Sequence, residues 1–191
     1  MWSKWSKPTG KHTTSTVNSM QNHTSSSVHS IAQIRPGAFR NACGMFGTGV
    51  TVITTRSDGV DYGMTANAFM SISLAPPLIA VSVANTANML VRIRQSGRFA
   101  VSILEESCEA LALHFAGRPD GSVAEPFFDF DHLPGVKDAC TVLAADVEQE
   151  IAAGDHVIFV GRVSHIHVDP EKAPLMFHKG QFGKLLSHEA L

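Results

Sequence analysis

The chain has 191 residues, of which 44% are hydrophobic and 17% are charged, as is typical of one soluble globular domain with a single core. No run of 18 apolar residues occurs, and Pro76-Pro77 interrupts the longest apolar region, so the sequence offers no candidate for a membrane span. Residues 1–57 hold six of the 15 basic residues and none of the 17 acidic ones. The rest therefore carries a net charge of −8, which argues against a nucleic-acid-binding surface there.

The first thirty residues are rich in Ser, Thr, Asn and His and contain almost no aliphatic side chains. Such a segment cannot bury enough apolar area to offset the entropy of ordering it. We therefore predict a disordered tail over residues 1–30 and one folded domain over residues 31–191. The tail lacks the apolar centre of a secretory signal. Two other interpretations are open: the tail is an organelle transit peptide, or translation begins further along, with Met20 as one candidate first residue.

Three cysteines, Cys43, Cys108 and Cys140, are odd in number and show no paired metal-ligand spacing. They are expected to be small buried side chains in a reducing compartment, with the cytoplasm as the predicted location.

The first predicted element of the domain is a helix over residues 36–46, where Pro36 starts an apolar spacing of three to four residues that includes Phe39, Cys43 and Phe46. A β-branched strand follows over residues 50–55. The glycines between the two precede a strand, whereas a dinucleotide fingerprint follows a strand and opens a helix, so a Rossmann site is rejected. Asp58-Gly59 then predicts a hairpin turn.

The stretch from residue 64 to residue 74 alternates without interruption and predicts one strand. Its expected buried face consists of Met64, Ala66, Ala68, Met70, Ile72 and Leu74. The other face carries hydroxyl and amide groups, one ring and no charge, and no residue from 62 to 91 is charged. We expect a neutral polar molecule, a loop or another subunit to cover that face.

A second strand is predicted over residues 78–83, after the proline pair has ended or bent the first. Asn88 is expected to cap a helix that stops at Gly97, and the free N–H groups at its start suit an anion such as phosphate.

The second half of the chain predicts a strand over 99–104, a helix over 107–115 closed by Gly117, and a surface loop over 119–134. Two strands over 141–151 and 157–168 flank a turn at residues 152–156, and a last short strand and turn follow from Pro174. At least six short strands with two or three helices predict a mainly β fold with peripheral helices, a Greek-key barrel.

These segments resemble the flavin reductase family, the small reductase components of two-component flavin monooxygenases. The resemblance covers roughly residues 36–186 and is carried by segments in the family's order: Phe39-Arg40, residues 49–54, 63–69, 71–73 and 76–78, Phe115-Ala116-Gly117, Gly154-Asp155-His156, Pro174-Leu175 and Gly180.

The resemblance implies a split β-barrel that binds FMN or FAD and forms a homodimer with the flavin near the subunit interface. It also implies oxidation of NADH or NADPH and release of reduced flavin to a separate oxygenase component. Hydride passes from the nicotinamide to flavin N5, so no covalent nucleophile is needed. Phe182 stands where relatives have tyrosine, and Met89 stands where many have a hydroxyl group.

The candidate site follows from the same resemblance, with a hydrogen-bonding edge for the flavin expected at residues 65–67. The predicted cofactor-binding residues are Gly49, Val50, Thr51, Met64, Thr65, Ala66, Asn67, Ser71, Ser82, Thr86, Asn88, Phe115, Arg118, Gly154, Asp155 and Phe182. His156 is the catalytic candidate and would orient the nicotinamide or meet its phosphates. No metal site is predicted, because His165 and His167 share a strand face without a third ligand.

Two other functions remain open from the sequence. The same pocket could carry flavin without a nicotinamide site, as a non-enzymatic binding protein. A related barrel that oxidises a pyridoxal phosphate precursor would need several Arg and Lys around its ligand, and the uncharged stretch 62–91 counts against it.

Overall fold

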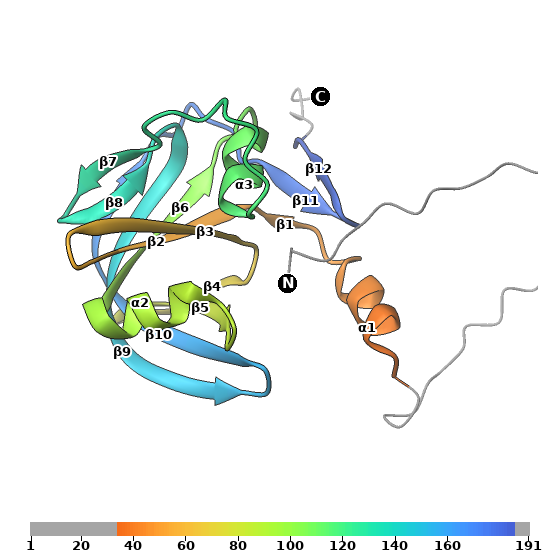
Figure 1. Cartoon of the computed structure of the whole chain (residues 1–191), viewed down its shortest axis with the longest axis horizontal. Helices are drawn as coiled ribbons and strands as arrows, with labels where there is room; N and C mark the ends of the chain where they lie inside the picture. Colours follow the sequence, from red (N-terminus) through yellow and green to blue (C-terminus); the bar gives the residue numbers. More distant parts are fainter. Residues whose placement is uncertain (1–33, 186–191) are drawn as a thin grey trace, which may run out of the picture.

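The computed structural model describes residues 34–185, so the predicted tail lies outside the described residues. Within this range the chain forms three helices and twelve strands (Figure 1). The helices are α1 (Pro36–Cys43), α2 (Asn88–Ser96) and α3 (Glu109–Phe115). The strands are β1 (Thr48–Gly49), β2 (Thr51–Ser57), β3 (Val60–Ala66), β4 (Phe69–Leu74), β5 (Pro77–Ala84), β6 (Arg98–Leu104), β7 (Phe127–Phe130), β8 (Leu133–Val136), β9 (Ala139–Ala153), β10 (His156–Val168), β11 (Met176–His178) and β12 (Gln181–Gly183).

Seven strands form an antiparallel sheet in the order β3-β2-β6-β9-β10-β5-β4. Its two edge strands, β3 and β4, are consecutive in the chain and are joined only by Asn67 and Ala68. Three peptide steps span at most about 11 Å, so the sheet must curl until its edges meet at this end. The N–H of Ser82 donates to the carbonyl of Ala68 at 3.1 Å beside the join. The fold is the predicted split β-barrel.

The expectation of one strand over residues 64–74 is wrong, because β3 ends before Asn67-Ala68 and β4 begins after it. The two strands lie at opposite edges of the sheet. The expected faces are also wrong on β4, where Met70, Ile72 and Leu74 are exposed. The register between β4 and β5 also shifts between Ser71 and Ser73, which interrupts the regular alternation of faces after Met70.

A turn and a helix end lie where the sequence predicts them. Asp58 and Gly59, both with positive φ, form the turn between β2 and β3, and Gly97 closes α2 in the left-handed conformation. Asn88 is the first residue of α2 and not its cap, since Ala87 is the N-cap and no side chain caps the helix. The expected loop over residues 119–134 contains the strand β7 and the start of β8, which pair as a hairpin.

The helix α1 projects from the barrel (Figure 1) and buries none of its residues. Phe39 and Phe46, which the helical spacing predicts on one apolar face, are exposed, and so is Cys43. The prediction of a buried Cys43 is therefore wrong for this chain alone, whereas Cys108 and Cys140 are buried as predicted.

The main core fills the barrel between the curled sheet and α2, which lies across one end of it (Figure 1). Ile53, Ile93, Phe99 and Val101 are fully buried in this core. No helix among residues 34–185 is long and apolar enough to cross a membrane.

Substitution of Gly161 by Ala tests the close packing of this core. A Cβ at Gly161 would lie 2.6 Å from Phe99 Cζ and 3.0 Å from Ala145 Cβ. Because buried Phe99 cannot move away without strain, we expect Gly161→Ala to destabilise the protein by about 1–3 kcal/mol. Thermal unfolding measures the effect. At Gly37 an added methyl group meets nothing within 4 Å, so Gly37→Ala is the control, and equal unfolding temperatures for the two variants would contradict the packing.

Candidate functional site

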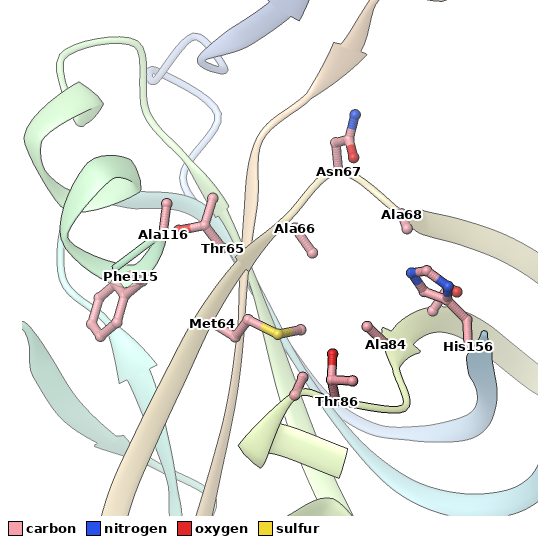
Figure 2. A pocket seen from close by; sticks show the side chains of 12 residues that line it. Met64, Thr65, Ala66, Asn67, Ala68, Ala84, Thr86, Phe115, Ala116 and His156 are labelled. Carbon is pink, nitrogen blue, oxygen red and sulfur yellow. The ribbon is translucent and has the colours of Figure 1, made fainter. Parts of the chain in front are cut away.

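A cavity of about 290 Å³ lies where the join between β3 and β4 meets the end of β5, the start of α2, the end of α3 and the first residue of β10. Its volume is close to the lower end of the range for small-molecule sites. The cavity is lined by Met64, Thr65, Ala66, Asn67, Ala68, Ser82, Ala84, Thr86, Ala87, Phe115, Ala116 and His156 (Figure 2). The lining contains no Arg, Lys, Asp or Glu, so the cavity suits a neutral, partly polar group.

The structure brings together eight of the predicted site residues around this cavity. They are Met64, Thr65, Ala66, Asn67, Ser82, Thr86, Phe115 and His156. The segments that supply them are far apart in the sequence, and the closure of the barrel brings them into contact.

Nine predicted site residues do not line the cavity. They are Gly49, Val50, Thr51, Ser71, Asn88, Arg118, Gly154, Asp155 and Phe182. Val50 and Thr51 are buried, and the hydroxyl of Thr51 donates to the carbonyl of Ala66 at 2.7 Å. Thr51 therefore supports the cavity wall from behind.

The remaining members of that set lie further along the surface or pack against a second buried cluster, which includes Val50, Leu104 and Leu175. Ser71 is exposed on β4, Asn88 and Arg118 are exposed beside the lining segments, and the ring of Phe182 packs edge-on against Phe177 at 5.5 Å between centroids.

Four alanines of the lining were not among the predicted residues. They are Ala68, Ala84, Ala87 and Ala116. Their methyl groups leave the space open, but alanine is equally common in helices and cores, so the residue type alone gives no signal for their role. For Ala68, Ala87 and Ala116, the positions next to Asn67, Thr86 and Phe115 could have indicated it.

The side chain of Thr65 makes a contact within the protein that the sequence does not indicate. Its side chain is buried and its hydroxyl donates to the carbonyl of Ala112 in α3 at 2.7 Å. This bond attaches α3 to β3. The hydroxyl proton is therefore used within the protein, so a ligand can contact this hydroxyl only by donating a hydrogen bond to its oxygen. Figure 2 shows the Asn67 amide pointing away from Met64 and His156.

His156 is held at the edge of the cavity by the turn between β9 and β10. Its Nδ1 lies 2.7 Å from Oδ1 of Asp155, and its side chain is 18% exposed against 95% for Asp155. Gly154 has a left-handed φ of 64°, as the turn requires. Asn85 fixes this turn, because its N–H donates to the Asp155 carbonyl at 2.9 Å and its side-chain amide donates to the Gly154 carbonyl at 3.3 Å.

Other reactive side chains do not form a second centre in the part of the chain that the structure describes. Nδ1 of His165 lies 2.9 Å from Asp131 Oδ2, and residues 34–185 contain no group of three His, Cys, Asp or Glu that could hold a metal. Burial raises the pKa of the Cys108 thiol, which disfavours the reactive thiolate.

Comparison with known proteins identifies the class to which this fold and cavity belong. Residues 43–186 match the family model described as "Flavin reductase like domain". The chain belongs to this family.

Relatives of known name agree with this assignment. The chain is 40% identical over 157 residues to an NADH-dependent flavin reductase from a Rhodococcus species, covering 80% of this chain and 88% of the relative. It is 38% identical over 149 residues to the reductase component of 4-hydroxyphenylacetate 3-monooxygenase from Thermus thermophilus, and the match covers 78% of this chain and 96% of the relative. The chain is also similar in structure to the NADH:FAD oxidoreductase SgcE6 from Streptomyces globisporus, solved in complex with NAD and FAD fragments. The TM-score is 0.76 at 30% identity, and the match covers 86% of this chain and 100% of SgcE6.

The contact between Asp155 and His156 predicts a specific titration. The hydrogen bond from His156 lowers the pKa of the Asp155 carboxyl group. A lowered pKa means that the paired carboxylate stabilises the fold above its unfolded-state pKa, and that this stabilisation is lost as the pH falls through the lowered value. The side chain is exposed, so the effect on stability is small.

The carboxyl carbon resonance of Asp155, followed by NMR between pH 2 and pH 6, measures this pKa. We expect the midpoint to rise toward the ordinary aspartate value in His156→Ala. An unchanged midpoint would show that the two side chains do not interact in solution.

Proposed function

We propose that this protein is an NADH-dependent flavin reductase that transfers a hydride to FMN or FAD and supplies reduced flavin to a separate oxygenase component. The observation that carries the proposal is an anchored histidine at the edge of a neutral cavity. The names of the relatives in the same family support it, since they include an NADH-dependent flavin reductase and the reductase component of a monooxygenase.

The residues around the cavity fit a flavin ring. Met64 and the lining alanines offer flat apolar contacts, and Ser82 and Thr86 add hydroxyl groups. Peptide groups at Ala66 and Asn67 lie beside them and can form hydrogen bonds with the polar edge of the ring. The flavin, when bound, accepts a hydride at N5 from the nicotinamide. The work of the protein is to hold two flat rings against each other and to keep water away.

His156 is proposed to position the nicotinamide nucleotide. The carboxylate of Asp155 holds Nδ1, so the ring is fixed and Nε2 stays available for a ligand. Figure 2 shows the imidazole directed toward the same space as the hydroxyl of Thr86 and the sulfur of Met64. A carrier that only binds flavin has no need of this anchored ring, which favours the enzyme over the carrier.

The phosphate of the flavin is proposed to lie near the start of α2. No side chain caps this helix, and Thr86 and Ala87 just before it line the cavity. Free N–H groups at a helix start bind anions. Met89, where the family resemblance leads us to expect a hydroxyl group, is buried in the core. Arg118, exposed after α3, is a further candidate for a phosphate contact.

A homodimer is proposed from the exposed apolar side chains at one edge of the barrel. Leu74 is 93% exposed, and Met70 and Ile72 beside it on β4 are exposed as well. An edge strand with apolar side chains offers both open backbone groups and a hydrophobic surface to another chain. A second copy covering this edge would lie next to the join of β3 and β4, and so next to the cavity.

We also expect the protein in the cytoplasm.

Flavin-dependent oxidation of NADH tests the proposed activity. Purified protein with NADH and either FMN or FAD is expected to lose the NADH absorbance without any organic substrate. We expect His156→Ala to lower kcat/KM for NADH at least about tenfold while flavin affinity changes less than threefold, because one oriented contact of this kind is worth about 1.5–3 kcal/mol. The exposed His167 of β10 provides the control His167→Ala. Equal loss in both variants, or no turnover with either flavin and either nicotinamide, would contradict the proposal.

Introduction of a charge on β4 tests the proposed dimer. Burial of a glutamate at position 74 against a second copy would be unfavourable, so Leu74→Glu is expected to be monomeric in sedimentation equilibrium while the wild type is dimeric. Val60 is half exposed at the first residue of β3, and Val60→Glu is the matched control. A wild-type monomer, or a dimer in both variants, would contradict this interface.

A further inference from the structure

A glycine on β3 makes room for the aromatic ring at the end of α3. A Cβ on Gly63 would lie 2.5 Å from Cε1 and 2.6 Å from Cδ1 of Phe115, whereas carbon atoms in contact are normally 3.5–4.0 Å apart. The φ of Gly63 is not positive, so its conformation alone does not require glycine. Residue 63 therefore has no side chain for a reason of space, and that space is filled by Phe115.

The ring of Phe115 is also confined on its other sides. The ring of Phe127 stacks on it, with centroids 5.3 Å apart and an angle of 30° between planes. The His114 ring meets it edge-on at 4.8 Å and 82°. A ring pushed away from β3 would have to displace these neighbours, because closely packed interiors contain little free space.

Two contacts therefore seat α3 on β3. Alternate residues of a strand share a face, and Gly63 and Thr65 form the face that receives the helix, one through the Phe115 ring and the other through its bond to the Ala112 carbonyl. Figure 2 shows the Phe115 ring and the Met64 side chain on opposite sides of β3. Phe115 and Ala116, at the end of the seated helix, line the cavity.

We propose that Gly63 and Phe127 are positioning residues of the flavin site, which hold Phe115 and with it the end of α3, so that Phe115 and Ala116 form a fixed wall for the bound ring. Neither Gly63 nor Phe127 lines the cavity. This inference rests on the proposed function, because it assigns the cavity to flavin. It adds a role for two residues that act on the ligand through the Phe115 ring.

The substitution Gly63→Ala tests the packing of Phe115 against β3, with Gly135→Ala as a matched control. A Cβ on Gly135 would lie 2.7 Å from two ring carbons of Phe128, yet neither residue lines the cavity. We expect both variants to unfold at lower temperature. Only Gly63→Ala is expected to raise the Kd for FMN or FAD, by about tenfold or more, since small displacements in a site are costly. Quenching of flavin fluorescence on titration with protein measures the Kd.

A second substitution restores the space that the added methyl group takes. Phe115→Leu removes the ring, so the double variant Gly63→Ala/Phe115→Leu is expected to bind flavin within threefold of Phe115→Leu alone. A general loss of stability would not show this dependence on Phe115.

The inference is overturned if Gly63→Ala and Gly135→Ala bind flavin equally well, or if the effect of Gly63→Ala is the same with and without the Phe115 ring. Should Gly63→Ala not fold, Phe127→Leu replaces it, with Phe128→Leu as its control and the same difference in Kd expected. Wild-type protein that binds neither flavin would instead contradict the proposed function itself, and with it this inference.

Discussion

The two-residue join of Asn67 and Ala68 is the constraint on which the barrel and its cavity depend. It connects the two edges of a seven-stranded sheet, and a link this short forces the edges together at one end only. The sheet, whose edge strands β3 and β4 would otherwise lie far apart, is thereby wrapped around the main core. The cavity lies at this join, because here the last residues of β3, the end of β5 and the turn before β10 converge. The geometry of the site is therefore a direct consequence of barrel closure.

The neutrality of the cavity and the anchoring of one histidine together define its chemistry. Hydride transfer between two ring systems requires contact, alignment and exclusion of water, and it requires no acid or nucleophile in the protein. The lining provides small apolar and hydroxyl groups, and Asn85 and Asp155 fix the turn that carries His156. On the opposite side, Thr65 and Gly63 attach α3 to the barrel. Both walls are held by contacts outside the cavity.

The sequence predicts the elements whose signals are local. The strands β5, β6, β9 and β10, the turn at Gly59 and the stop at Gly97 follow from β-branched runs and glycine positions within a few residues. The break at Asn67 is invisible to periodicity, because the alternation continues across the join while the chain passes from one sheet edge to the other. The partner of Thr65 lies 47 residues away in α3, so only the folded chain reveals why that hydroxyl is engaged. The placement of His156 at the cavity was predictable through the resemblance to a family, and the apolar exposure of Leu74 was not predictable from alternation.

The central claim is that a flavin ring binds beside Met64 at the join of β3 and β4, and the methyl resonances of methionine test it most directly. In protein labelled with ¹³C at the methionine methyl groups, titration with FMN is expected to shift the Met64 resonance strongly through the ring current of the bound flavin. The resonance of Met176, which lies on β11 and does not line the cavity, is expected to change little. A titration that shifts Met176 and leaves Met64 in place would contradict the account.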